Sequence, residues 1–176
     1  MKINYLVVIV LGLLSCNQEM NNKKEITVEE ISSQKKQISA MLDSFNIAAS
    51  NSDYKTYFNF FNKNATFIGT DAKENWSKDS FMIWAKPYFD KKKTWNFKAL
   101  ERNIYFSNHA DIAWFDELLK TQMKICRGSG VVIKVNNTWK VQQYVLSMTI
   151  PNENVNEVIK IKTPIEDSLI QKLELK

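Results

Sequence analysis

The 176-residue chain has one histidine, two cysteines, four glycines and three prolines. One histidine and two distant cysteines cannot supply the clustered nitrogen and sulfur ligands of a transition-metal site, so no metal is predicted. The chain also lacks the P-loop, G-x-S-x-G and G-x-G-x-x-G patterns of nucleotide-binding proteins and serine hydrolases, and no cofactor is predicted. With 44% hydrophobic and 24% charged residues, the composition is typical of one globular domain with a tail.

The amino terminus carries the pattern of an export signal. Lys2 gives it a positive start, and the apolar run at residues 5–14 is too short to cross a bilayer as a helix. The run ends in Leu13-Leu14-Ser15-Cys16, which resembles the lipobox of bacterial lipoproteins. The resemblance implies a signal peptide over residues 1–15, cleavage before Cys16, and acyl chains such as palmitate on Cys16.

The predicted lipoprotein signal determines where in the cell we expect the protein. Several acyl chains hold a protein firmly, so we expect a membrane-anchored lipoprotein of the cell envelope, facing the periplasm or the cell surface, with residues 16–26 as a tether. The alternative is an ordinary secretory signal followed by a chance cysteine. The net charge of +5 includes Lys91-Lys92-Lys93, but such a run is typical of a solvated helix end or loop. Since an envelope protein meets little nucleic acid, no nucleic-acid partner is predicted.

Helix signals dominate the first half of the mature chain and return in its tail. Thr27-Val28-Glu29-Glu30 matches a capping box and predicts a helix that stops around Asn51. Asp53 and Ser77 are the expected caps of two further helices. The tail, residues 153–176, predicts an amphipathic helix opened by Thr163-Pro164.

From Trp95 onward the spacing of apolar residues changes to the alternation of β-strands. The first predicted strand runs from Trp95 to about Phe106, and the second runs from Ile112 to Leu119. Two further strands form a hairpin over residues 126–152. Cys126 lies in the first hairpin strand and is expected to be a small core residue.

Helices followed by a mostly antiparallel sheet indicate an α+β fold. The order of elements over residues 31–152 resembles the SnoaL-like branch of the nuclear transport factor 2-like superfamily. The segments that carry the resemblance are Ala113–Glu117, Arg127–Val131, Trp139–Val141 and Leu146-Ser147. It implies a cone-shaped domain over residues 27–152, in which N-terminal helices pack in a bent, mostly antiparallel sheet around a cavity. This superfamily includes isomerases, cyclases and dehydratases as well as non-enzymatic binding domains, so the fold alone does not decide the function.

The register of the hairpin decides which side chains face the cavity, because a one-residue slip exchanges the two faces of a strand. Asn136-Asn137 tolerates positive φ and marks the turn. A two-residue loop pairs Val132 with Val141, whereas a loop that includes Thr138 pairs Arg127 with Ser147. The longer loop separates apolar from polar side chains better and is the preferred register. Its apolar face consists of Val131, Ile133, Val135, Trp139, Val141 and Val145.

The preferred register also brings polar groups to one end of the apolar face. The predicted ligand-binding residues are therefore Arg127, Ser129, Gln143 and Ser147, with Phe115, Trp139 and Tyr88 as aromatic lining. Glu117 is expected near Arg127, and Asp116 is expected to point outward; the alternative is the opposite assignment of these two carboxylates. An Arg127–Glu117 pair would either recognise a polar group on an apolar ligand or act as a structural salt bridge. Glu117 and Asp116 are the candidate catalytic bases.

Three functions fit these observations. The preferred one is a lipid-anchored envelope protein whose SnoaL-like domain binds a small apolar or amphipathic ligand without catalysis, because the sequence is rich in rings and shows no convincing catalytic set. The second is an isomerase, cyclase or hydrolyase-type enzyme with a carboxylate base in the cone, Glu117 or Asp116. The third is an interaction module that forms a homodimer through the outer sheet face or binds another envelope protein.

Overall fold

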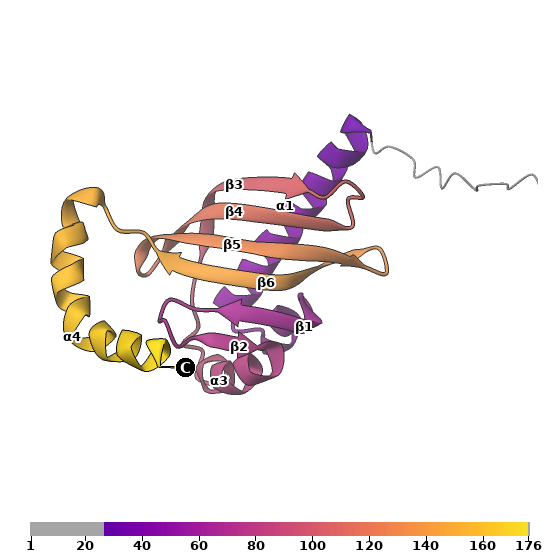
Figure 1. Ribbon diagram of the computed structural model, residues 1–176. Helices are drawn as coiled ribbons and strands as arrows, with labels where there is room; N and C mark the ends of the chain where they lie inside the picture. The colour runs from indigo at the N-terminus through magenta and orange to yellow at the C-terminus, as the bar shows by residue number, and fades with distance from the viewer. Residues whose placement is uncertain (1–26, 176) are drawn as a thin grey trace, which may run out of the picture.

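The structure is a computed structural model that describes residues 27–175 (Figure 1). Its elements in chain order are α1 (Val28–Ser50), α2 (Tyr54–Asn59), β1 (Phe61–Ile68), β2 (Asn75–Ser77), α3 (Lys78–Asp90), β3 (Lys98–Phe106), β4 (Ile112–Thr121), β5 (Lys124–Val135), β6 (Thr138–Met148), the 3-10 helix η1 (Asn152–Asn154) and α4 (Val155–Glu174). The predicted signal peptide, the lipidation of Cys16 and the tether lie outside the described residues.

Local capping groups fix where the first three helices begin. Thr27 Oγ1 accepts the N–H of Glu30 at 3.1 Å, and the Glu30 carboxylate accepts the N–H of Thr27 at 2.9 Å, which completes the predicted capping box. The side chains of Asp53 and Ser77 each accept a backbone N–H from the first turn of α2 and α3. Both predicted caps are therefore confirmed.

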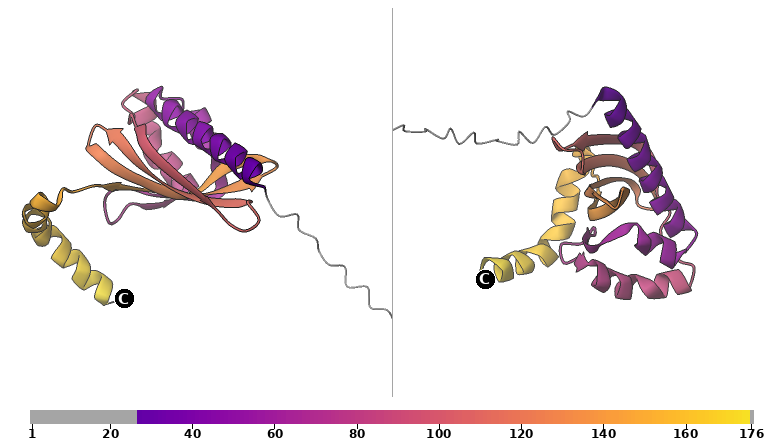
Figure 2. Two further views of the ribbon diagram at one scale, coloured as in Figure 1. Left: turned by 90° about the horizontal axis from the view of Figure 1, so that it is seen from above. Right: turned by 90° about the vertical axis from the view of Figure 1, so that its right-hand side faces the viewer.

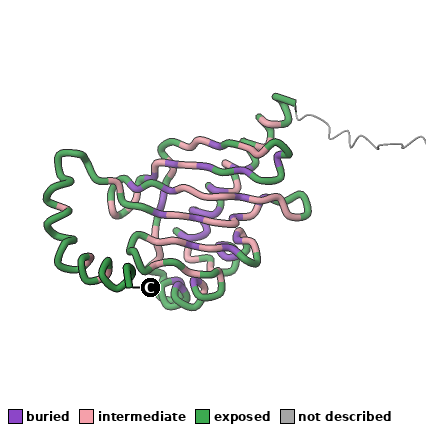
Figure 3. The backbone as a smooth tube through the Cα atoms, in the orientation of Figure 1, coloured by how far each residue is buried: buried purple, intermediate pink, exposed green. Residues whose placement is uncertain are grey.

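The strands form one sheet in the order β2-β1-β6-β5-β4-β3. β1 runs parallel to β6, and the other neighbouring pairs are antiparallel. α1 crosses one face of the sheet, and α3 lies beside its β2 edge (Figures 1 and 2). The buried residues gather between these helices and the sheet (Figure 3). The predicted α+β architecture, with N-terminal helices on a mostly antiparallel sheet, is confirmed.

The loop of the β5–β6 hairpin is shorter than the preferred prediction. Asn136 and Asn137 have φ of 48° and 61°, the pair of left-handed conformations that a two-residue hairpin loop requires. Next to the loop, Val132 therefore pairs with Val141. The preferred loop that included Thr138 is wrong.

A β-bulge then restores part of the rejected register. Gln142 has no opposite residue on β5, so the pairing shifts by one residue, and Val131 pairs with Gln143. Arg127 pairs with Ser147, as the longer loop had predicted. The bulge also turns β6 over, because the buried side chains after it are Tyr144 and Leu146 rather than Gln143 and Val145.

Glycines at inward positions of β5 explain why its apolar pattern predicted the wrong face. A Cβ on Gly128 would lie 2.4 Å from the Tyr144 hydroxyl oxygen, and a Cβ on Gly130 would lie 3.0 Å from the Phe115 ring. Large side chains of β4 and β6 thus close over β5 on the helix side. The more hydrophobic residues of β5, such as Val131 and Ile133, alternate with these positions and face the other way.

The C-terminal helix α4 stands apart from the core. It runs without interruption through Pro164, which lies inside the helix and not at its start as predicted. Neither α4 nor η1 contributes a buried residue. Figure 1 shows α4 curving away from the end of β6. Across residues 27–175, no helix has the length and hydropathy required to cross a membrane.

Candidate binding pocket

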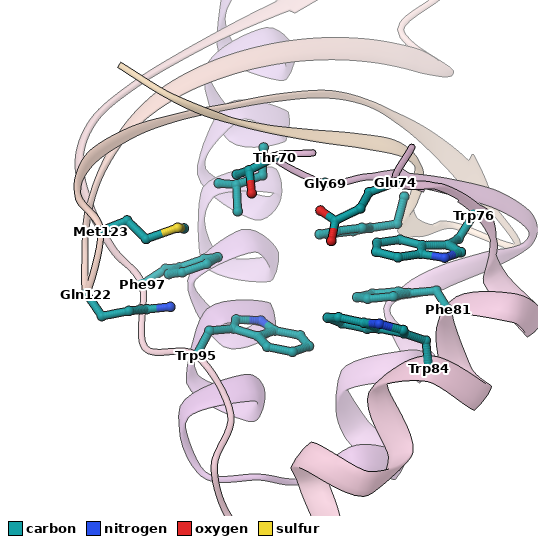
Figure 4. Close-up of a pocket in the computed structure, with 12 residues that line it drawn as sticks. Gly69, Thr70, Glu74, Trp76, Phe81, Trp84, Trp95, Phe97, Gln122 and Met123 are labelled. Carbon is teal, nitrogen blue, oxygen red and sulfur yellow. The ribbon is translucent and has the colours of Figure 1, made fainter. Parts of the chain in front are cut away.

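A pocket of about 160 Å³ opens at the β1–β2 end of the sheet (Figure 4). It is enclosed by the β1–β2 hairpin, α3, the segment before β3 and the β4–β5 turn. Its lining residues are Phe67, Gly69, Thr70, Glu74, Trp76, Phe81, Trp84, Trp95, Phe97, Gln122, Met123 and Leu146. An apolar engineered cavity of about 150 Å³ binds benzene, so this pocket has room for one ring or a group of similar size.

Nearly parallel aromatic rings form one wall of the pocket. The Phe67 and Phe81 centroids are 4.1 Å apart at an interplanar angle of 9°, and those of Trp76 and Trp84 are 4.8 Å apart at 28°. Trp95 lies 6.0 Å from Phe81 at 22°. Rings stacked in this way cover one another's faces and form a rigid apolar wall, which suits an apolar group.

The sequence brings these rings together through the short β2–α3 junction. Trp76 is the central residue of β2, and Ser77 directly after it caps α3. Phe81 and Trp84 then lie three residues apart, on one face of the helix, and stack at 5.9 Å. One strand residue and one helix face therefore build most of the wall.

The opposite wall comes from segments far away in the chain. Figure 4 shows Phe97 and Met123 across the space from Trp76 and Phe81, with Trp95 between the two sides and Gln122 at the rim. Thr70 and Gln122 offer polar groups that can bind a ligand substituent. Trp84 is 38% exposed and lies at the solvent side of the ring wall.

Glu117, a candidate base, lies in a buried polar cluster and does not line this pocket. Its side chain accepts hydrogen bonds from Arg102 Nε at 2.8 Å and from the Tyr144 hydroxyl at 2.9 Å. Arg102 also donates to the Ser39 carbonyl and forms an ion pair with Asp43, at 3.0 Å each. Glu117 is therefore neutralised by a guanidinium and held by a phenol.

Burial, followed by the neighbouring Glu117 carboxylate, raises the pKa of Tyr144 well above its ordinary value. The phenol consequently keeps its proton further into the alkaline range than an ordinary tyrosine, and it donates its hydrogen bond to Glu117. Burial also raises the pKa of Tyr57 in the adjoining ring cluster.

The predicted Arg127–Glu117 pair is wrong, since Arg127 pairs instead with Asp116, at 3.6 Å, on the outer face of the sheet. Asp116 points outward, as predicted. The partner that sequence reasoning missed is Arg102, which lies directly opposite Glu117 on β3. If the strands on either side of the predicted turn at residues 107–111 are paired, Arg102 lies opposite Glu117 or next to it. The sequence therefore contained the information needed to predict this pair.

The other predicted ligand-binding residues also lie away from the pocket. Arg127, Ser129, Gln143 and Ser147 are on the outer sheet face, because the bulge and the inward glycines reverse the expected faces. Phe115 and Trp139 are buried core residues, and Trp139 Nε1 donates to Gln34 at 2.9 Å. Tyr88 is exposed on α3 and packs against Trp84, with ring centroids 4.9 Å apart and an interplanar angle of 35°.

The pocket itself was missed, although one signal pointed to it. Three of the five tryptophans in the chain fall between residues 76 and 95, and all three line the pocket. Cys126 is buried as predicted. Within residues 27–175, no cluster of His, Cys, Asp and Glu has the arrangement of a metal site.

Solved structures show the same fold at low sequence identity. A nuclear transport factor 2-like (NTF2-like) protein of unknown function from Pseudomonas putida KT2440 superposes with a TM-score of 0.59 at 10% identity, covering 70% of this chain and 92% of that one. An NTF2-like protein from Streptomyces avermitilis, described as a proposed dehydratase, gives 0.59 at 10%, covering 69% and 99%. A proposed scytalone dehydratase from Novosphingobium aromaticivorans gives 0.58 at 11%, covering 70% and 89%.

At these identities the structures establish the fold alone. A search of curated proteins finds no match to this chain. Residues 38–151, which include the ring wall, the buried cluster and the hairpin, match the family model described as the SnoaL-like domain. The chain therefore belongs to the SnoaL-like domain family, with the NTF2-like α+β fold.

Proposed function

We propose that this protein binds a small apolar or amphipathic ligand in the pocket lined by Trp76, Trp84 and Trp95, without catalysing a reaction. The observation that carries the proposal is a solvent-connected pocket with a wall of nearly parallel rings and only a few polar groups. Apolar pockets with a small number of convergent polar groups are the usual form of a small-molecule site.

The buried carboxylate favours binding over an isomerase, cyclase or hydrolyase-type reaction. A general base must reach the proton that it removes, and Glu117 is 1% exposed and held by Arg102 and Tyr144. Asp116 is on the outer sheet face beside Arg127. The dehydratase descriptions of two structural neighbours therefore gain no support from these two residues.

The proposal is tested by native mass spectrometry of the full chain, extracted in mild detergent from its own cell envelope. We expect a reproducible adduct of one small molecule per chain. A homodimer that carries no adduct would contradict the binding function and favour the second candidate.

That second candidate is a homodimer formed through the outer sheet face. Tyr105 and Trp114 stack on this face at 6.0 Å and are 46% and 47% exposed, and Ile112 beside them is also exposed. Exposed aromatic residues that lie together are typical of protein interfaces.

We also propose that lipid on Cys16 holds the protein at the cell envelope; the support is the lipobox-like segment that ends in Cys16. In a cell-fractionation experiment, the Cys16→Ala variant should move from the membrane fraction to the soluble fraction. Unchanged membrane attachment of the variant would refute this anchoring.

A further inference from the structure

The pocket contains one charged side chain. Of its lining residues, only Glu74 carries a charge, and Figure 4 shows its carboxylate pointing into the space between the ring wall and Phe97. Oε2 accepts the backbone N–H of Asp71 at 3.2 Å. Among residues 27–175, no lysine or arginine forms an ion pair with Glu74. The pocket therefore holds a negative charge without a cation of its own.

Gly69 gives this carboxylate its position. A Cβ at residue 69 would lie 2.2 Å from Glu74 Oε2 and 3.0 Å from Glu74 Cδ, so the side chain occupies space that only glycine leaves free. The hydrogen bond from Gly69 N–H to the Glu74 carbonyl, at 2.9 Å, closes the hairpin at the same place. The backbone of the β1–β2 hairpin thus fixes where the negative charge enters the pocket.

The rings around Glu74 favour the same sign of ligand charge. The face of an aromatic ring is electrostatically negative, and tryptophan attracts cations more strongly than phenylalanine or tyrosine does. Trp76, Trp84 and Trp95 all line the pocket. Trp76 and Trp84 stack on each other at 4.8 Å, so each covers a face of the other, whereas Trp95 lies 6.4 Å from Trp84, and Figure 4 shows its ring outside this stack, beside the open space. An anionic ligand would meet the Trp95 ring together with the Glu74 carboxylate and would be excluded.

We infer that the pocket recognises the cationic head of an alkylammonium ligand, with Glu74 as the counter-ion and the Trp95 ring as a cation–π contact. This inference rests on the proposed binding function and names its ligand class. The volume of about 160 Å³ suits a head group of the size of trimethylammonium. Thr70 and Gln122 lie where a hydroxyl or carbonyl on the ligand would find hydrogen-bond partners.

The test compares three compounds of nearly equal shape that differ in charge. Choline is the cation, 3,3-dimethyl-1-butanol is its neutral isostere, and 3,3-dimethylbutanoate is an anion with the same tert-butyl group. Each is titrated into the full chain in detergent, with tryptophan fluorescence and isothermal titration calorimetry as readouts. We expect choline to bind at least about tenfold more tightly than the neutral compound and the anion to show no saturable binding.

Two variants assign the effect to Glu74. Glu74→Gln should weaken choline binding by about tenfold and remove the preference over the neutral isostere. Gly69→Ala should weaken choline binding in the same direction, because the added methyl group displaces the end of the Glu74 side chain. Glu101→Gln is the matched control: Glu101 is exposed on β3, away from the pocket, and its replacement should leave all three affinities unchanged.

The outcomes separate this inference from the proposed function. Equal or tighter binding of the neutral isostere, or unchanged choline binding by Glu74→Gln, would overturn the cation preference and leave an apolar binding site. Absence of saturable binding by all three compounds, together with no adduct on the full chain in native mass spectrometry, would overturn both.

Discussion

At the scale of single residues, the Glu117–Arg102–Tyr144 cluster shows how a buried carboxylate can serve structure rather than chemistry. Glu117 and the Arg102 guanidinium are almost fully buried, and they meet through two nitrogen–oxygen contacts of 2.7 and 2.8 Å. Removing one partner from a buried ion pair leaves an uncompensated charge in a medium of low polarity. The cluster therefore ties β3, β4 and β6 to α1.

Arg102→Met should lower the free energy of unfolding by about 3–5 kcal/mol, because it leaves the Glu117 carboxylate without its counter-ion. Urea unfolding measures this change. Arg127→Met is the matched control, since Arg127 is half exposed and only 3.6 Å from Asp116; its cost should stay within about 0.5 kcal/mol. Similar losses for both variants would contradict a special role of Arg102.

The raised pKa of Tyr144 has a consequence at alkaline pH. Above about pH 10 the unfolded chain loses its tyrosine protons, whereas folded Tyr144 keeps its proton, so the unfolded state binds fewer protons and stability falls as pH rises. The contribution is fully present below pH 10. Between the pKa of Tyr144 in the unfolded chain and its raised pKa in the folded chain, the free energy of unfolding falls as pH rises. Tyr144→Phe should make this fall less steep by up to about 1.4 kcal/mol per pH unit. An unchanged slope would show that the Tyr144 pKa is not raised.

At the scale of elements, the β5–β6 hairpin combines a two-residue loop, a bulge and inward-facing glycines. Gly130 is the tightest point, because a Cβ there would lie 2.2 Å from the Gln143 backbone oxygen, next to the bulge. The backbone of Gln143 cannot rotate away from an added methyl group as a side chain could. The place of glycine in this strand thus follows from the close approach of β6.

Gly130→Ala should therefore cost about 2–3 kcal/mol of unfolding free energy, the upper range for overpacking. Ser129→Ala, one residue away on the outer face, is the control and should cost less than about 0.5 kcal/mol. Urea titrations of both variants give the comparison. A Gly130→Ala protein as stable as the wild type would mean that β6 can move away from β5.

α4 is an element of a different kind, since it buries no residue against the domain. A chain that ends at Pro151 should therefore keep its unfolding free energy within about 1 kcal/mol of the full chain. Circular dichroism during urea titration measures this. A loss of several kcal/mol would show that α4 packs on the domain in solution.

At the scale of the whole molecule, features set by neighbouring residues could be predicted from the sequence, and features set by distant contacts could not. The caps at Thr27, Asp53 and Ser77 are local and were predicted correctly. The bulge at Gln142 depends on how β6 pairs with both β1 and β5, which periodicity does not encode. The α+β fold depends on the order of helices and strands along the chain, and that order could be predicted from the sequence.

The candidate site was harder to predict for the same reason. Its walls come from four separate segments, so only the folded chain shows that Trp76, Trp84, Trp95 and Gln122 surround one space. The residues expected to face the cavity, such as Arg127 and Ser147, were predicted from one assumed register of the β5–β6 hairpin. The two-residue loop and the bulge together place them on the opposite face.

The most direct test of ligand binding at the tryptophan wall compares two tryptophan variants of the full chain by native mass spectrometry. Trp84 and Trp114 are similarly exposed, at 38% and 47%, but only Trp84 lines the pocket. We expect Trp84→Ala to lower the ligand-bound fraction and weaken the affinity by about tenfold or more, and Trp114→Ala to leave both unchanged. A bound molecule that survives Trp84→Ala and is lost in Trp114→Ala would contradict a site in this pocket.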